Sequence, residues 1–199
     1  MDIEMQVKEI AAQRGVLHTA DFAALGATSY ELRKLVAQGV LNRVGRGLYS
    51  LSDFEVTEAH GIVEAVQAQS KGVVCLLSAL AFHVIGTQQP HQVWLAIPYG
   101  ARISQNRPAP TRVVVMRPSA YEHGIEVHRL EGVEVPIYSV AKTVADCFKF
   151  RNTVGLDVAI EALREALRER RCTREEIRKY ARIDRVEKIM RPYMEALAA

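Results

Sequence analysis

Cysteine is scarce in this chain: Cys75, Cys147 and Cys172 are the three cysteines among 199 residues. Their odd number and wide spacing exclude a disulfide framework, and they lack the paired C-x-x-C spacing of a structural zinc site. Cys75 and Cys147 lie in apolar segments, where a free cysteine usually packs as a small hydrophobic side chain. We therefore expect reduced, structural thiols.

Long hydrophobic runs are also missing. No segment approaches the roughly 20 apolar residues that span a bilayer, and Met1–Met5 shows no basic segment followed by an apolar run, as a secretory signal would. Hydrophobic residues make up 49% and charged residues 25% of the chain, which is ordinary for a globular protein. The sequence predicts a cytoplasmic protein without a membrane partner, with one large domain or two small ones.

Patterns that carry catalysis are absent as well. The six histidines form no H-x-x-x-H or H-E-x-x-H pair, and no Walker loop occurs. The strand-like segments 126–128 and 134–136 lack the Glu-x-Lys lysine of restriction-type nucleases. We predict no enzymatic activity, no catalytic residue, no metal site and no cofactor. His83 is expected to be a satisfied core or interface histidine, and Lys142 with Asp146 either a helix-surface pair or a buried polar contact.

Charge of either sign is not in large excess. The formal net charge is +3, and residues 1–51 hold six Lys and Arg against five Asp and Glu. Residues 164–191 hold eleven against six, so the basic excess lies near the C-terminus. Two interpretations of that segment stay open. One is a solvated helix face with mixed i,i+4 pairs, and the other is a second phosphate-contacting surface that includes Arg170, Arg171 and Arg174.

The strongest positive signal lies in residues 15–51. A helix over about 3–14 ends at Gly15, Thr19 is a suitable N-cap for a short helix over 20–25, and Thr28 or Ser29 begins a helix to about Gln38. Strand-like segments 41–44 and 48–51 then flank Gly45-Arg46-Gly47, which suits a tight hairpin. This order predicts a winged helix-turn-helix.

In that motif the second helix of the pair enters the major groove and the hairpin lies along the duplex. Arg33 is suited to a bidentate contact with guanine, and Lys34 and Ser29 to phosphates. The predicted DNA-binding residues are Ser29, Tyr30, Arg33, Lys34, Arg43 and Arg46. The alternative is a protein-interaction module, which the small net charge of residues 1–51 favours.

The rest of the chain alternates helical and strand-like segments. Helices are expected over 57–69, 78–85, 139–150, 156–169, 173–180 and 186–197, and strands over 92–97, 112–117, 125–130 and 133–138. Glu131-Gly132 predicts a two-residue hairpin turn, and 73–77 is either a strand or the start of a helix. We expect an α+β protein: a winged helix-turn-helix in residues 1–52, then an α+β domain in 53–199 with a small, mainly antiparallel sheet and several helices.

Four segments in order resemble the AbiEi family, the antitoxin half of abortive-infection (type IV) toxin–antitoxin systems. Residues 39–49 are similar to the family's G-x-L-x-R-V-x-R-G-x-Y ending, and 77–86 to its S-A-L-x-x-H-G helix, with Val84 and Ile85 before the glycine. Residues 93–98 and 135–146 are similar to the strand and the S-x-x-K-T-x-x-D helix that follow.

The resemblance implies a transcriptional autorepressor that binds inverted repeats in double-stranded DNA upstream of its own operon. It also implies a C-terminal domain needed for antitoxicity and a nucleotidyltransferase-like toxin that is opposed without a stable complex. The family's DNA contacts fall on the six residues named above. A different function, a nuclease-type phage-defence protein steered to DNA, is the alternative from the class of enzymes.

Overall fold

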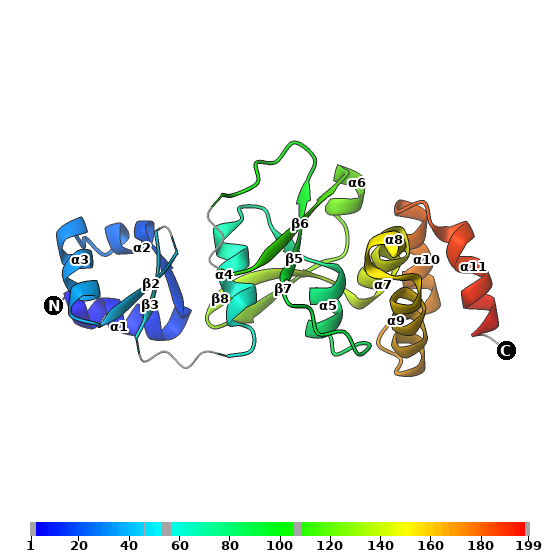
Figure 1. Cartoon of the computed structure of the whole chain (residues 1–199), viewed down its shortest axis with the longest axis horizontal. Helices are drawn as coiled ribbons and strands as arrows, with labels where there is room; N and C mark the ends of the chain where they lie inside the picture. Colours follow the sequence, from blue (N-terminus) through cyan, green and yellow to red (C-terminus); the bar gives the residue numbers. More distant parts are fainter. Residues whose placement is uncertain (1–2, 46, 53–56, 106–108, 198–199) are drawn as a thin grey trace. The chain divides into compact units, whose positions relative to one another are not determined.

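The computed structural model describes residues 3–45, 47–52, 57–105 and 109–197 (Figure 1). The chain divides into two compact units. The first contains residues 1–70, 103–110 and 128–135, and the second contains 71–102, 111–127 and 136–199. The predicted boundary near residue 52 falls beside residues 53–56, which lie outside the described part of the chain.

The first unit begins with three helices and a small antiparallel sheet. Its first elements are α1 (Ile3–Arg14), β1 (Val16–His18), α2 (Thr19–Ala24), α3 (Ser29–Ala37), β2 (Leu41–Gly45) and β3 (Leu48–Leu51). The strand order is β1-β3-β2, and both pairings are antiparallel. Phe22, Leu32, Leu35 and Leu41 pack together in its core, which places one side of α3 against the unit. The burial of these side chains is the main force that holds the short helices in place.

Most of the predicted elements of this segment are confirmed, and two details differ. The helix over 3–14 has the expected bounds, but α2 begins at Thr19, with His18 as its N-cap. The backbone N–H of His18 donates to the Asp21 carboxylate at 2.7 Å. Strand β1 was not predicted, because three residues carry no periodicity and its pairing of Val16 with Ser50 joins distant parts of the sequence.

Helix α4 (His60–Ala68) completes the described helices of the first unit. It is shorter than the predicted helix over 57–69, because its N-cap is Ala59 and not Thr57. The Thr57 hydroxyl instead donates to the Glu131 carboxylate at 2.6 Å. The same carboxylate lies 2.8 Å from Nδ1 of His60. Thr57 therefore serves a contact across the unit and does not begin the helix.

The larger sheet has five strands in the order β6-β5-β4-β8-β7. They are β4 (Val73–Val74), β5 (Val93–Pro98), β6 (Thr111–Met116), β7 (Ile125–Leu130) and β8 (Val133–Tyr138). The expectation of a mainly antiparallel sheet is wrong, because β5 pairs in parallel with β6 and β4 in parallel with β8. Parallel neighbours need long connections, and residues 99–110 supply one between β5 and β6. Glu131 and Gly132 both have positive φ, as the predicted hairpin turn requires.

Seven helices of the second unit fall in the described residues. They are α5 (Leu76–Phe82), α6 (Pro118–Tyr121), α7 (Val140–Lys149), α8 (Arg151–Val154), α9 (Leu156–Arg168), α10 (Arg174–Ile183) and α11 (Glu187–Ala196). Helix α7 lies among the others, against α5, α9 and α10 (Figure 1). Every residue from Val140 to Phe148 is buried as a result.

This packing decides the roles of polar residues for which the sequence allowed more than one. His83 is 7% exposed, and its Nε2 lies 2.7 Å from the carbonyl oxygen of Tyr138, so the expectation of a satisfied core histidine is confirmed. Lys142 and Asp146 form a buried ion pair within α7, and Asp184 joins them at 3.4 Å from Nζ. Cys75 and Cys147 are buried free thiols, as expected.

Candidate nucleic-acid interface

Helix α3 owes its start to a reciprocal cap. The Thr28 hydroxyl oxygen accepts from the backbone N–H of Glu31 at 3.2 Å, and the Glu31 carboxylate accepts from the backbone N–H of Thr28 at 2.7 Å. These bonds satisfy two donors that a helix N-terminus otherwise leaves without a partner. The first turn of α3, which carries Ser29 and Tyr30, is therefore held in place.

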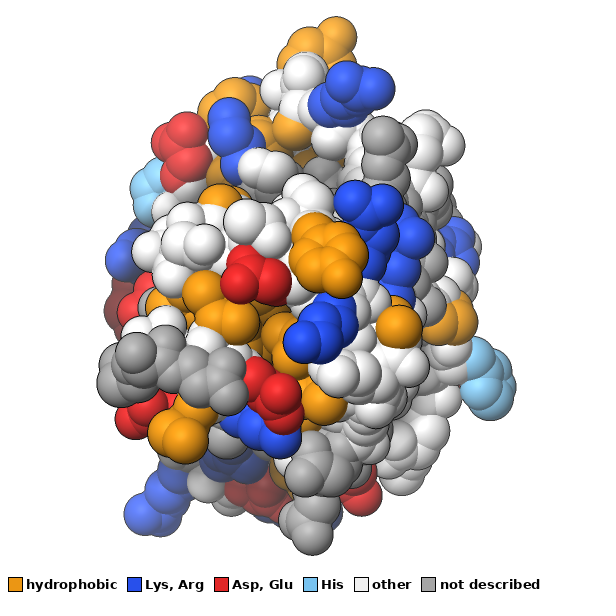
Figure 2. Space-filling model, turned by 90° about the vertical axis from the view of Figure 1, so that its left-hand side faces the viewer, with side chains coloured by type: hydrophobic (Ala, Val, Ile, Leu, Met, Phe, Trp, Pro, Cys, Tyr) orange, Lys and Arg blue, Asp and Glu red, His pale blue; other side chains and the backbone are white. Residues whose placement is uncertain are grey.

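One face of α3 is open to solvent. Tyr30, Arg33, Lys34 and Ala37 are exposed and stand at i, i+3, i+4 and i+7, whereas Leu32 and Leu35 point into the core. Tyr30 is 72% exposed, which is unusual for so large a side chain. In Figure 2, which views the side of the molecule on which α3 lies in Figure 1, Lys and Arg side chains gather beside an exposed hydrophobic side chain.

Arg33 has a defined orientation on this face. Its Nε donates to the carbonyl oxygen of Ser29 at 3.1 Å, which draws the side chain toward the N-terminal end of α3. The two terminal nitrogens of the guanidinium are the atoms that form a bidentate pair with a guanine edge. They stand beside the first turn, the part of a recognition helix that meets base edges.

The hairpin of β2 and β3 carries the other predicted contacts. Arg43 is exposed on β2, opposite Tyr49, and a register shift follows between Arg43 and Gly45. Gly47 has a φ of +76°, and a Cβ there would lie 3.0 Å from Oγ1 of Thr19. The backbone N–H of Thr19 donates to the Gly47 carbonyl at 2.9 Å, which ties the hairpin to α2. Arg46, the predicted contact at the tip, lies outside the described residues.

The electrostatics of this surface are mixed. Hydrogen bonds from the backbone and side chain of Thr28 lower the pKa of Glu31, with a smaller contribution from Lys34. Glu31 is therefore ionised at neutral pH, and it offsets part of the positive charge of Arg33 and Lys34. An anion in the first turn stabilises the helix dipole, so this carboxylate serves the fold of α3 at some electrostatic cost to anion binding.

Five of the six predicted contacts are thus exposed residues of α3 or β2, and the structure adds two further polar candidates. Gln38 follows α3 and continues its exposed face, and Asn42 is exposed beside Arg43. Gln38 stands four residues after Lys34, and this helical spacing already places it on the outward face from the sequence alone. Asn42 gave no such signal, because the exposure of a residue in a short strand depends on how the sheet packs.

The basic segment near the C-terminus forms contacts of its own. Arg168 pairs with Glu169 at 3.3 Å, and the guanidinium of Arg174 donates to the carbonyl oxygens of Met194 and Leu197 at 2.7 and 2.6 Å. Arg174 therefore supports the last turn of α11, where the helix carbonyls otherwise lack donors. Of the two interpretations of this segment, these contacts favour the helix face.

Within residues 3–45, 47–52, 57–105 and 109–197, no group of three His, Cys, Asp or Glu residues could hold a metal ion. In the same ranges no helix combines the length and the apolar composition needed to cross a bilayer.

Comparison with solved structures shows the fold. The crystal structure of the RV2827C protein from Mycobacterium tuberculosis resembles this chain with a TM-score of 0.58 and 12% sequence identity. The likeness covers 88% of this chain and 69% of that one. No curated protein matches the chain in sequence.

The family comparison is confined to the N-terminal segment. It covers α1, α2, α3 and the β2–β3 hairpin, the elements that carry the exposed face described above. The match confirms the resemblance that the sequence suggested: residues 5–52 match the family of transcriptional regulators described as AbiEi antitoxins.

Proposed function

We propose that residues 1–52 form a winged helix-turn-helix that binds double-stranded DNA, with α3 in the major groove and the β2–β3 hairpin as the wing. The observation that carries the proposal is the exposed face of α3. It presents Tyr30, Arg33 and Lys34 beside a capped first turn, in a segment that matches a family of transcriptional regulators. The contacts are Ser29, Tyr30, Arg33, Lys34, Arg43 and Arg46.

In this arrangement the contacts divide into two kinds. Lys34, Arg43 and Arg46 neutralise phosphates, which supplies affinity without sequence preference. Arg33 reads a guanine in the groove, and a good bidentate pair discriminates by about 1–3 kcal/mol against the wrong base. The regulator binds inverted repeats upstream of its own operon and represses transcription by occluding the promoter.

The second part of the proposal concerns antitoxicity. The chain acts in the cytoplasm as the antitoxin of a type IV system and opposes a nucleotidyltransferase-like toxin without a stable complex. The match of residues 5–52 to AbiEi antitoxins supports this role. The proposal includes no catalytic step by this chain. Sustained cleavage of DNA with added magnesium or manganese would instead establish a DNA-directed nuclease.

The DNA proposal is tested by fluorescence anisotropy with the chain's own upstream DNA. Arg33→Ala and Arg46→Ala are expected to weaken binding at least tenfold, because each removes a cation from the interface. Lys8→Ala is the matched control: Lys8 is an exposed cation on α1, paired with Glu4 at 2.7 Å, and lies on neither α3 nor the hairpin. If both arginine variants bind as tightly as the wild-type chain, the segment is a protein-interaction module and the proposal is wrong.

The antitoxin proposal has a separate test. The chain is co-expressed with a nucleotidyltransferase-like toxin of the type IV class, and growth is measured. We expect the full chain to restore growth, and Arg33→Ala to restore it equally well when the promoter is foreign, since repression is then irrelevant. Failure of the full chain to restore growth would remove the antitoxin role and leave the DNA proposal intact.

A further inference from the structure

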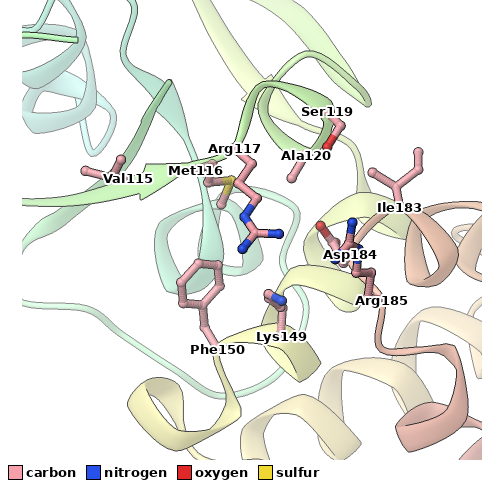
Figure 3. A pocket seen from close by; sticks show the side chains of 10 residues that line it. All are labelled: Val115, Met116, Arg117, Ser119, Ala120, Lys149, Phe150, Ile183, Asp184 and Arg185. Atoms are coloured by element: carbon pink, nitrogen blue, oxygen red, sulfur yellow. The ribbon is translucent and has the colours of Figure 1, made fainter. Parts of the chain in front are cut away.

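A pocket of about 270 Å³ lies in the second unit, and none of the residues assigned to DNA lines it (Figure 3). Three segments form it: the end of β6 with α6, the end of α7, and the turn after α10. The pocket is lined by Val115, Met116, Arg117, Ser119, Ala120, Lys149, Phe150, Ile183, Asp184 and Arg185. Neither the family match nor the proposed function assigns it a role.

Three cations face this pocket from three different segments. Arg117, Lys149 and Arg185 are exposed, and within the described residues none of them forms an ion pair. Figure 3 shows their side chains around a common space. Convergent cations without a protein counter-charge repel one another, and an anion placed between them removes that repulsion.

The negative charge in the pocket lining is smaller than the positive charge of these three cations. Asp184 is 3% exposed, and its carboxylate lies 3.4 Å from Nζ of Lys142, which offsets part of its negative charge. The C-terminal ends of α7 and α10 add partial negative charges of roughly half a unit each. Three full positive charges exceed these contributions, and the pocket is therefore suited to an anion.

Apolar side chains also line the pocket. Phe150 is half-buried at the end of α7, and its ring lines the pocket together with Ile183 and Val115 (Figure 3). Sites for small organic molecules typically combine such apolar walls with a few convergent polar groups. An inorganic anion would use the cations and leave the Phe150 side of the space empty.

The turn that carries Arg185 adds a geometric observation. Arg185 has a φ of +60°, a conformation that costs energy for any residue with a Cβ. The turn is closed by a hydrogen bond from the Val186 N–H to the Ala181 carbonyl at 2.8 Å. Glycine would fit this backbone without strain, yet an arginine stands there. Strained positions with a functional side chain cluster at ligand sites.

We propose that this pocket binds a small organic phosphate of the size of a nucleoside monophosphate. Arg117, Lys149 and Arg185 hold the phosphate, and the base or another flat apolar group packs against Phe150 and Ile183. The site does not depend on the DNA interface, because all of its residues lie in the second unit.

The test is isothermal titration of the full chain with adenosine monophosphate, adenosine and inorganic phosphate in separate runs, without DNA. Adenosine monophosphate is expected to bind more tightly than either of the others, since it alone satisfies both sides of the pocket. Lys149→Gln and Arg185→Gly should each raise its Kd about tenfold, the usual effect of one lost charge-assisted hydrogen bond. Arg185→Gly also relieves the strained backbone, so it is expected to fold.

Arg170→Gly is the matched control, because Arg170 is also an exposed arginine at positive φ, 53°, and does not line the pocket. Its Kd should equal that of the wild-type chain, and so should that of Arg33→Ala. Absence of binding at millimolar adenosine monophosphate would overturn the proposal. Equal affinity for inorganic phosphate, or the same weakening in Arg170→Gly, would overturn it too.

Discussion

Val84 is the residue at which the backbone departs most clearly from what its side chain prefers. It has a φ of +55° two residues after the end of α5, and it is 74% exposed. A β-branched side chain in the left-handed region is a genuine outlier, and the cost is of order 1–2 kcal/mol. Since little of the side chain is buried, packing does not offset this cost. The strain belongs to the turn that brings Ile85 back into the core.

Replacing Val84 by asparagine should therefore stabilise the second unit. Asparagine tolerates this conformation and adds no glycine-like entropy to the unfolded chain, so Val84→Asn is expected to raise the free energy of unfolding by about 1 kcal/mol. The measurement is urea unfolding followed by circular dichroism. Val127→Asn is the control: Val127 is 65% exposed in strand β7 and is not among the residues with positive φ. It should be neutral or destabilising, and an equal gain in both variants would contradict the explanation.

The proposed role of Arg33 depends on the shape of its side chain as well as on its charge. A lysine keeps the charge at this position but loses the planar pair of donors. Arg33→Lys is thus expected to retain binding to unrelated DNA and to lose about tenfold or more in the ratio of operator to unrelated affinity. Anisotropy titrations with both duplexes at one salt concentration measure this ratio. An unchanged ratio would assign Arg33 to a phosphate.

At the scale of elements, two helices begin with the same cap. Thr173 and Glu176 start α10 with the hydrogen-bond distances that Thr28 and Glu31 show at α3, 2.7 and 3.2 Å. The lowered pKa of Glu176 has the same leading cause, the backbone hydrogen bond to Thr173. The two caps match, but only α3 is assigned to DNA. Removing each cap in turn therefore distinguishes an effect on the stability of the fold from an effect on DNA binding.

Thr28→Ala and Thr173→Ala should each destabilise the unit that holds the helix by about 1 kcal/mol, the usual cost of a lost N-cap. Only Thr28→Ala is expected to weaken DNA binding at a temperature where both variants are fully folded, because it loosens the turn that carries Ser29 and Tyr30. Hydrogen exchange reports the local loss, and anisotropy reports the affinity. Equal DNA affinity of the two variants would argue against α3 as the recognition helix.

The packing of α7 against α10 encloses a charged group of three. Nζ of Lys142 lies between Asp146 and Asp184, 4.8 Å from the ring centre of Tyr138, and all three charged residues are 3% exposed or less. Gly124 permits this packing, because a Cβ there would meet Cβ of Lys142 at 2.7 Å. One cation cannot balance two carboxylates. Burial first, and then the charge of Asp184, raise the pKa of Asp146 well above its ordinary value, against the opposing effect of Lys142.

This raised pKa makes the free energy of unfolding depend on pH. A carboxyl that binds its proton more tightly in the folded state contributes stability below its unfolded pKa, about 3.9, and loses it as pH rises through the folded pKa. Asp146→Asn removes that loss, so its stability relative to the wild-type chain should improve between pH 5 and pH 8. Urea unfolding at both values measures the difference.

A constant difference at pH 5 and pH 8 would show that Asp146 is ionised throughout and would contradict the expectation. Lys142→Met tests the same buried group by removing its cation. It leaves Asp146 and Asp184 buried without a counter-charge, and it should cost about 3–5 kcal/mol at neutral pH. Its cost should shrink as the pH falls and Asp146 takes up its proton.

Over the whole molecule, the position of charge matters more than its sum. The net charge of +3 hides a basic excess in residues 164–191, where Arg174 already supports α11. If DNA is bound by α3 and the hairpin, the slope of log affinity against log salt should fall by about one when Lys34 is neutralised. Joint replacement of Arg170 and Arg171 by glutamine should leave the slope unchanged. A flatter slope in that double variant would make the C-terminal helices a second phosphate-contacting surface.

The sequence by itself determined the elements whose signals are local. The bounds of α1, the caps of α3 and α7, and the Glu131-Gly132 hairpin follow from residues no more than four positions apart, because helix periods, caps and two-residue turns act over that range. The α3 face was predictable for the same reason, since Tyr30, Arg33 and Lys34 share it by helical spacing alone.

Only the tertiary structure decided which distant segments meet. The pairing of Val16 with Ser50, the parallel pairs that made the larger sheet mixed, and the approach of Asp184 to Lys142 across 42 positions have no local signature. The cationic pocket has the same origin, because Arg117, Lys149 and Arg185 come from three separate segments. Such contacts are selected by the burial of the core as a whole, a collective quantity that no short stretch of sequence specifies.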